Sequence, residues 1–407
     1  MRILLTLGLL SWASLAAAQT PFTVVVETAV ENGRQIKGQV ALTADGQSTS
    51  KRFVIRVPAS AQAWNGSLVI GAHGGSGGDA VDRAGRVYAT SETALDDVIG
   101  QYALANGFAY ASVDRDGAMS SRAGLQLTHE FADLVKTEIA RLAGRAPART
   151  YLVGLSMGGG IARLAAEDAQ KRFAGTLIIA GAGGDLVTRV DRLTKMNGLW
   201  RLIDPLAHIG MSPDDTKMVA YAAAVGTPVE ARRLWPYTGS GAAAALKQAQ
   251  TAIEETTGEL QLPTIEVAGT WDDLVIREIR GYRLRAQPAD YHRLYQVNRA
   301  WHMSGDDDGV QGFQFAADAR MRLNKDVADA MGEGPSYIPT VREAFDHLVR
   351  WVEKGASPPA SQTIESGAKR SELRGRMRCD FGDLGAERYI LCGHAGRPHQ
   401  HRNHAKR

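Results

Sequence analysis

Residues 149–170 read RTYLVGLSMGGGIARLAAEDAQ, and the prediction of the fold depends on this stretch. The apolar run RTYLV leads directly into Gly154-Leu155-Ser156-Met157-Gly158, and a helix-forming segment follows. A G-x-S-x-G pattern between a strand and a helix predicts a sharp turn that presents the serine hydroxyl, because the glycines permit close backbone approach. The N-terminus of the following helix favours negative charge beside that hydroxyl. Ser156 is therefore the candidate nucleophile.

The glycines of this turn also allow a competing interpretation. Gly154, Gly158 and the glycines after them are similar to the phosphate-binding turn of a short-chain dehydrogenase, which binds a dinucleotide at a helix N-terminus. Such enzymes carry a Tyr-x-x-x-Lys pair, and no tyrosine of this chain has a lysine four positions later. The pattern therefore favours a hydrolytic serine, for which neither a metal ion nor an organic cofactor is predicted.

Outward from this stretch, apolar strand-like runs alternate with helical segments. Continuous apolar strands with helices on both faces of the sheet indicate a mostly parallel sheet of the α/β class. Residues 22–58 precede these runs and predict antiparallel edge strands, because β-rich segments there alternate with turn residues. The apolar runs are SLVIGAHG (67–74), FAYASVDRDG (108–117), GTLIIAGAGG (175–184), PTIEVAGT (263–270) and YHRLYQVNRAWH (291–302).

An acid and a histidine follow Ser156 in the order expected of a Ser-acid-His triad. Asp272 comes directly after PTIEVAGT, where its carboxylate can fix a histidine tautomer and stabilise the imidazolium. Asp273 is the rival acid, and a loop carboxylate or a helix N-cap is its alternative role. His302 follows the last strand-like run and is the candidate general base.

Acyl transfer also needs donors for a tetrahedral oxyanion, usually an amide after the nucleophile and one from a loop after an early strand. Met157 offers the first amide, and Gly75 or Ser76 in the run His73 to Gly78 offers the second. A flexible loop is the alternative for this glycine run. Trp271 and Trp301 adjoin the proposed acid and base and are predicted either to line the substrate pocket or to belong to the core.

Taken together, SLVIGAHGG, GLSMG, GTWDDLV and AWH resemble the α/β-hydrolase family over residues 52–356. The likeness implies an α/β-hydrolase fold, and it favours Asp272 because family members place the acid three residues after the glycine. The export pattern of residues 1–18, the His73-Gly74-Gly75 loop and the cap-length insertion 185–262 resemble bacterial secreted esterases of the feruloyl esterase and polyhydroxyalkanoate depolymerase kind. This likeness implies a small or polymeric ester as substrate. A serine peptidase or amidase on the same fold, and a non-catalytic binding protein, remain open.

The N-terminus has the pattern of a secretory signal peptide. Met1-Arg2 supplies a positive start, residues 3–10 are an apolar run, and Ala16 to Ala18 form a small-residue cleavage site. The apolar run is too short to span a membrane, so no stable membrane anchor is expected. Cleavage after Ala18 predicts a secreted or periplasmic protein.

The motifs divide the chain into a signal peptide, a core in two parts, an insertion and a tail. The insertion is long for a simple crossover and predicts a helical cap or lid, with an enlarged helical layer as the alternative. Apolar residues at helical spacing predict an amphipathic helix over 340–354. The predicted segments are the signal peptide 1–18, the core 19–184, the cap 185–262, the core 263–356, and the linker and basic tail 357–407.

Cys379 and Cys392 are the only cysteines and both lie in the tail. An oxidising compartment favours a disulfide between them, with free thiols or a metal site shared with His394 as alternatives. The net charge of +3 and a pI of 8.8 are mildly basic. Nucleic-acid binding requires a denser basic stripe, so no nucleic-acid partner is expected.

Overall fold

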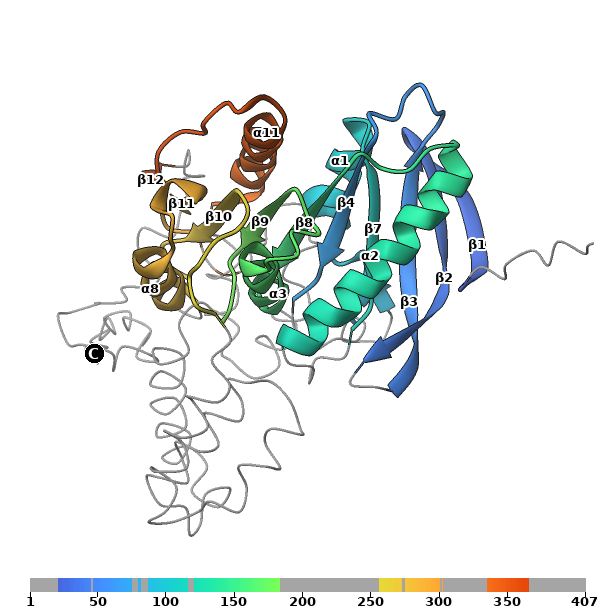
Figure 1. Cartoon of the computed structure of the whole chain (residues 1–407), viewed down its shortest axis with the longest axis horizontal. Coiled ribbons are helices and arrows are strands. Elements are labelled where there is room, and N and C mark those ends of the chain that lie inside the picture. The colour runs from blue at the N-terminus through green and yellow to red at the C-terminus, as the bar shows by residue number, and fades with distance from the viewer. Residues whose placement is uncertain are drawn as a thin grey trace, which may run out of the picture.

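The computed structural model of the chain describes residues 21–44, 47–74, 80–81, 87–115, 121–183, 256–272, 275–300, 302 and 335–365. Within this part of the chain, a ten-stranded sheet runs in the order β1-β2-β3-β7-β4-β8-β9-β10-β11-β12. Figure 1 shows this succession from β1 at one edge of the sheet to β12 at the other. The short strands β5 (Ala80–Val81) and β6 (Val87–Ala89) pair separately.

The first three strands form the antiparallel segment predicted for residues 22–58. They are β1 (Phe22–Val30), β2 (Gly33–Ala44) and β3 (Gln47–Pro58), and each pairs antiparallel with the next. β3 also pairs antiparallel with β7, which joins this meander to the rest of the sheet. The antiparallel prediction is confirmed.

The remaining strands of the large sheet run parallel to one another, as the continuous apolar runs predict. Every residue of the inner strands β4, β7, β9 and β10 is buried, because helices cover both faces of the sheet. The strands are β4 (Ser67–Ala72), β7 (Ala109–Val113), β8 (Arg149–Leu155), β9 (Gly175–Ile179), β10 (Thr264–Gly269), β11 (His292–Val297) and β12 (Gln362–Ile364).

Helices lie on both faces, and each face has its own apolar cluster. The first face carries η1 (Ser91–Thr93), η2 (Asp96–Gly100), α1 (Gln101–Ala105) and α11 (Ile338–Lys354). The other carries α2 (Ser121–Ala143) and α3 (Met157–Glu167), and α2 crosses the strands in Figure 1. The helix α8 (Ile276–Arg285) contacts α3 through a hydrogen bond from the Tyr282 hydroxyl to Glu167, and η5 (Ala289–Tyr291) follows it. The mostly parallel α/β prediction is confirmed.

The amphipathic helix predicted at 340–354 is α11, which begins slightly earlier, at Ile338. Phe345 and Leu348 are fully buried in the apolar cluster of this face, and Val349 and Val352 pack against it. Gly355 ends the helix in the left-handed conformation, with φ of 65°, which glycine adopts without steric cost.

The sheet continues beyond the predicted end of the core at residue 356. β12 pairs in parallel with β11, so the linker boundary drawn at residue 357 is wrong and the core includes Ile364. β11 is likewise not the last strand. The run Gln362-Thr363-Ile364 is short and its first residues are exposed, so it lacks the apolar pattern that identified the inner strands.

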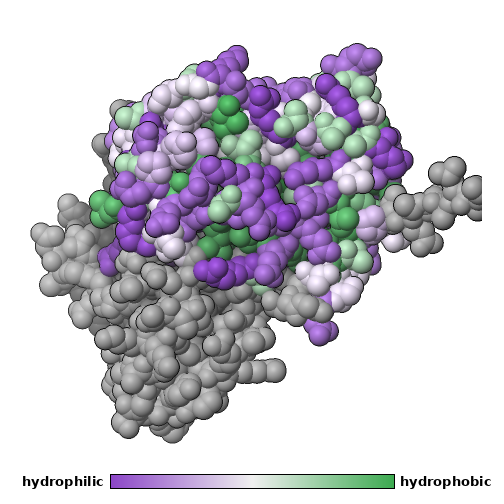
Figure 2. All heavy atoms as spheres, in the orientation of Figure 1, coloured by the Kyte–Doolittle hydropathy of each residue, from purple (hydrophilic) through white to green (hydrophobic). Residues whose placement is uncertain are grey.

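Several predictions lie outside the described residues: the signal peptide 1–18, residues 185–255 of the cap predicted over 185–262, and both cysteines. Among the helices that the structure describes, none combines the length and the apolar character needed to cross a bilayer. Figure 2 shows a face of the core that is mostly hydrophilic, with apolar residues in small areas between polar ones.

Candidate active site

Ser156 lies in the turn between β8 and α3, in a backbone conformation that non-glycine residues rarely adopt. Its φ is 54° and its ψ is −115°. The Ser156 N–H donates to the Ile179 carbonyl at 2.9 Å, and the Ser156 carbonyl accepts from the amides of Ala182 (2.8 Å) and Gly159 (2.9 Å). Such strain costs on the order of 1–3 kcal/mol and persists only where neighbours hold it, typically at functional sites.

The glycines of the motif are required by close packing around this turn. A Cβ atom on Gly154 would lie 2.2 Å from the Gly158 carbonyl oxygen. A Cβ atom on Gly158 would lie 2.0 Å from the carbonyl oxygen of Ala72, at the end of β4. The turn is therefore packed against the neighbouring strand as well as against its own helix.

Asp272, His302 and Ser156 form a chain of hydrogen bonds. The distance between Asp272 Oδ2 and His302 Nδ1 is 2.8 Å, and the distance between His302 Nε2 and Ser156 Oγ is 3.0 Å. A carboxylate only accepts, so Nδ1 carries the proton and Nε2 is left to accept from the serine hydroxyl. Asp272 is fully buried and His302 nearly so. The structure thus brings the three predicted residues together.

The adjacent strands β10 and β11 carry the acid and the histidine. Beyond the strand ends, the Thr270 amide donates to the Val297 carbonyl (3.0 Å) and the Trp271 amide donates to the Ala300 carbonyl (3.1 Å). The loops that hold Asp272 and His302 are therefore bound to each other, and this pairing keeps the carboxylate beside the imidazole.

Tyr337 also holds the histidine, and the sequence did not reveal it. Its hydroxyl donates to the His302 carbonyl at 2.9 Å, and both groups are buried. Tyr337 immediately precedes α11, so the helix packed on the sheet also fixes the backbone of the candidate base. A single tyrosine before a helix carries no motif that would identify this contact.

The predicted oxyanion-hole residues are only partly described. Met157 is the first residue of α3, next to Ser156, as expected. Gly75 and Ser76 lie outside the described residues, but Gly74 shows where their loop begins. A Cβ atom on Gly74 would lie 2.6 Å from Ser156 Cβ and 3.4 Å from Ser156 Oγ. The backbone of this loop therefore starts directly against the nucleophile.

His73 and Arg115 fix the start of this loop. The His73 ring donates from Nδ1 to the Gly74 carbonyl (2.8 Å) and accepts at Nε2 from the Arg115 amide (3.1 Å). The Arg115 guanidinium donates to the His73 carbonyl from Nε (3.2 Å) and Nη2 (3.0 Å). Burial, and then the charge of Arg115, lower the pKa of His73 to about 3. The ring is therefore neutral, and its tautomer is set by these partners.

Other predicted residues fall at or beside the site. Asp273 and Trp301 lie outside the described residues. Trp271 is 44% exposed, so it is not a core residue, and it stands next to Asp272. Within the described part of the chain, no group of three or more His, Cys, Asp or Glu side chains is arranged to hold a metal ion.

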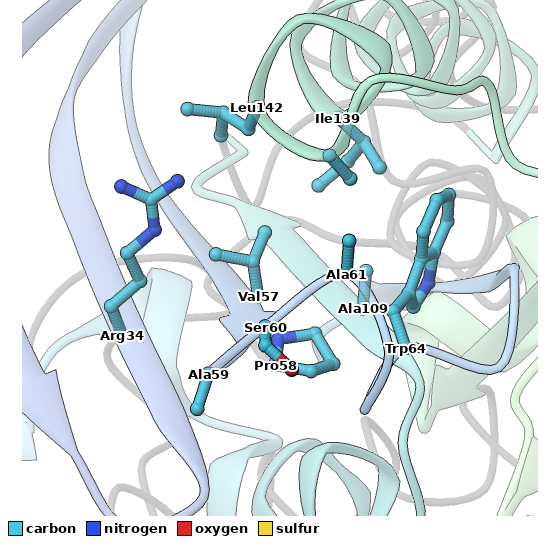
Figure 3. A pocket seen from close by; sticks show the side chains of 11 residues that line it. Arg34, Val57, Pro58, Ala59, Ser60, Ala61, Trp64, Ala109, Ile139 and Leu142 are labelled. Atoms are coloured by element: carbon cyan, nitrogen blue, oxygen red, sulfur yellow. The ribbon is translucent and has the colours of Figure 1, made fainter.

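A separate hollow of about 100 Å³ lies away from the triad. Figure 3 shows Trp64, Val57 and Ile139 pointing into it, with Arg34 at one side. Ala109 in its wall is the first residue of β7, whereas Ser156, Asp272 and His302 follow the carboxyl ends of parallel strands. The hollow therefore lies at the amino ends of the parallel strands, opposite the carboxyl ends where the triad lies.

Comparison with solved structures gives neighbours of low sequence identity. The rice cell wall degrading esterase LipA from Xanthomonas oryzae is 12% identical, with 78% of this chain and 92% of that chain covered and a TM-score of 0.47. Feruloyl esterase B from Aspergillus oryzae is 13% identical, with 80% and 81% covered and a TM-score of 0.44. Carboxyl esterase 2 from Tuber melanosporum is 14% identical, with 82% and 89% covered and a TM-score of 0.42. No curated protein matches the chain.

A comparison with models of protein families matches most of the chain. The model described as an alpha/beta hydrolase domain matches residues 23–381. This range is wider than the resemblance over residues 52–356, because it also takes in the antiparallel strands β1 to β3 and the edge strand β12. It contains the serine turn and the loops of the acid and the histidine. The chain belongs to the alpha/beta hydrolase family.

Proposed function

We propose that this hydrolase cleaves carboxylic esters through an acyl-enzyme formed on Ser156. The observation that carries the proposal is the hydrogen-bonded chain from Asp272 through His302 to Ser156. A serine hydroxyl is a weak nucleophile until a base within hydrogen-bond reach takes its proton, and that base needs a third group to orient it. The distances of 2.8 and 3.0 Å satisfy both requirements.

The reaction follows from these contacts. His302 Nε2 takes the hydroxyl proton as Ser156 Oγ attacks the ester carbonyl, and Asp272 stabilises the imidazolium that forms. The tetrahedral intermediate collapses, and the imidazolium gives its proton to the departing alkoxide, so that an alcohol leaves. A water molecule, deprotonated by the same histidine, attacks the acyl-enzyme and releases the carboxylic acid and the free serine.

The oxyanion of each intermediate needs N–H donors in fixed positions. We assign one to the Met157 amide, at the start of α3, and one to Gly75 or Ser76, in the loop that begins at Gly74. This assignment is supported by the close approach of Gly74 to Ser156 and by the hydrogen bonds between Arg115 and His73. Both features support a loop that lies against the nucleophile in the free enzyme.

The substrate pocket and the cellular location are further parts of this proposal. The exposed ring of Trp271 offers an aromatic surface beside the triad, suited to an acyl or aryl group. Residues 185–262 would cover the site as a cap. The N-terminal signal pattern supports export to the periplasm or the medium.

The first test compares the wild-type protein with Ser156→Ala on nitrophenyl esters, aryl esters, hydroxyalkanoate oligomers and peptide amides. Loss of the nucleophile should lower kcat on esters by about 10⁴-fold or more. An alanine variant with wild-type turnover would overturn the site assignment. Faster cleavage of amides than of esters would favour a peptidase, and inertness of both proteins toward every substrate would favour a binding protein.

The second test separates Asp272 from its rival. Asp272→Asn should lower kcat by about 10³–10⁴-fold, because an amide at this position favours the wrong histidine tautomer. Asp273→Asn is the matched control and should change kcat only a few-fold. The assignment of Asp272 is wrong if the Asp273 variant shows the larger loss.

A further inference from the structure

The helix that follows the nucleophile contains a completely buried arginine, Arg163. Charged side chains are almost never fully buried unless they are paired. Arg163 pairs with Glu266 of β10, which is also completely buried, through a hydrogen bond from Nη2 to Oε1. β10 is the strand that leads to Asp272, so this ion pair joins the helix of the candidate nucleophile to the strand of the candidate acid.

Stability alone is a poor explanation for such a pair. Removing two charges from water has a large free-energy cost, and the attraction between them repays it only where the geometry is excellent and further hydrogen bonds satisfy both groups. Replacement of a buried ion pair by well-packed neutral residues is therefore often neutral or stabilising. The other contacts of the guanidinium suggest a different role.

Arg163 holds the turn that follows β9. Its Nη1 donates to the carbonyls of Gly181 (3.0 Å) and Ala182 (2.7 Å). Gly181 leaves just enough room for this, since a Cβ atom there would lie 3.0 Å from Arg163 Nη2. The guanidinium is thus packed directly against the backbone whose carbonyls it binds.

That turn in turn holds Ser156. The Ser156 amide donates to Ile179 at the end of β9, and the Ser156 carbonyl accepts from Ala182. Ala180, between them, has a φ of 45°, so two strained non-glycine residues, Ser156 and Ala180, face each other across these bonds. Neither backbone conformation is favourable by itself. Because these hydrogen bonds join the two backbones, a shift of the Ala180–Gly183 turn would move the backbone of Ser156.

Gly183, the last residue of this turn, is held by a buried carboxylate. The Gly183 amide donates to Oε2 of Glu278 on α8 at 2.8 Å. The backbone before β10 is also bound by a carboxylate. Glu167, at the end of α3, accepts from the amides of Thr257 (2.7 Å) and Gly258 (2.8 Å). Gly183 is therefore bound to a side chain of α8, and Thr257 and Gly258 are bound to a side chain of α3.

We propose that Arg163 is a positioning residue of the active site, which fixes the Ala180–Gly183 turn and thereby keeps Ser156 Oγ aligned with His302. Arg163 touches no reacting atom and acts through the backbone. The proposal rests on the ester hydrolase function proposed above. A misplacement of about 1 Å at a reacting group can cost about 10²-fold in rate, so a backbone support of this kind can affect kcat without contacting substrate.

The test uses the full chain and three variants. Arg163→Met/Glu266→Gln removes both charges and avoids leaving a lone buried carboxylate. Arg163→Lys keeps the charge opposite Glu266 but lacks the planar fork that binds both carbonyls through Nη1 while Nη2 binds Glu266. Arg172→Met is the matched control, because Arg172 is an exposed arginine just beyond α3 that binds Gln170 and Asp133. For each variant we would measure thermal unfolding, kcat and KM on a nitrophenyl ester.

We expect the double variant to stay folded and to lose about 10- to 100-fold in kcat, with little change in KM. Arg163→Lys should lie between it and the wild type, and Arg172→Met should match the wild type. A purely structural arginine predicts the opposite, because neutralising the pair would then preserve kcat. Wild-type kcat in both the double variant and Arg163→Lys would overturn the inference. A fully active Ser156→Ala protein would instead overturn the proposed function.

Discussion

Several residues at the site are held by their neighbours in a backbone conformation, a protonation state or a packing contact that they would not adopt alone. Ser156 and Ala180 both have positive φ, although neither is glycine. His73 is a neutral histidine with both ring nitrogens engaged, and Gly74 beside it leaves no room for a side chain. Each of these residues depends on a partner from another part of the chain. The site is therefore sensitive to changes that leave Ser156, His302 and Asp272 untouched.

His73 should make the protein less stable in acid. Its pKa is lowered to about 3 in the folded protein, from about 6.5 in the unfolded chain, so the unfolded chain binds more protons between these values. Its contribution is fully present above pH 6.5 and falls by about 1.4 kcal/mol per pH unit as pH drops toward 3. Urea unfolding at pH 7, 6 and 5 should show a steeper loss for the wild type than for His73→Gln. The other buried histidines are common to both proteins and cancel, so parallel curves would contradict this prediction.

At the scale of elements, the edge strand β12 supports the strand that leads to the candidate base. The Asn298 amide donates to the Ile364 carbonyl (2.9 Å), and the Leu294 amide donates to the Ser361 hydroxyl (2.9 Å). Asn298 follows β11 directly and precedes the His302 loop. β12 therefore contributes to holding that loop, although it contains no candidate catalytic residue.

Proline substitutions should reveal this role of β12. The Ile364 carbonyl faces β11, so strand alternation also turns the backbone of Gln362 toward β11 and that of Thr363 away from it. Both side chains are exposed. Gln362→Pro should lower the free energy of unfolding by about 1–3 kcal/mol, and Thr363→Pro, the matched control, should lower it clearly less. Urea unfolding measures the difference. Equal effects of the two prolines would contradict this pairing.

At the scale of the whole molecule, the parallel sheet brings distant residues together. Ser156 and His302 are 146 residues apart along the chain, yet their side chains are in hydrogen-bond contact. Each of the triad residues follows the carboxyl end of a parallel strand, and these ends share one edge of the sheet. In the strand order, the antiparallel meander β1 to β3 extends the sheet beyond β7, on the side away from β10 and β11.

Export and oxidation are predictions about the whole chain. Protein recovered from the periplasm or the medium should begin at Gln19 and carry a Cys379–Cys392 disulfide. Intact mass spectrometry should then show the loss of residues 1–18 and of two hydrogens, and an alkylating reagent should modify the cysteines only after reduction. An uncleaved N-terminus would contradict export, and immediate alkylation would contradict the disulfide.

Features that depend on local pattern could be predicted from the amino-acid sequence. The G-x-S-x-G turn, the apolar runs of the inner strands and the helical spacing at 340–354 each encode backbone geometry within a few residues, and the structure contains all of them. Chain order then supplied Asp272 and His302 as partners of Ser156. β12 was missed because an exposed edge strand lacks the apolar pattern of a buried one.

The side chains that support the site can be identified only in the folded protein. Three supporting side chains lie in no motif. Arg163 binds the backbone of the Ala180–Gly183 turn, Arg115 binds that of His73, and Tyr337 binds that of His302. Nothing near these residues in the sequence shows such contacts. Their partners come from other strands and loops, and packing of the sheet and helices brings them within hydrogen-bond distance. A local pattern cannot specify such contacts, because they depend on the distance between chain segments and not on the order of neighbouring residues.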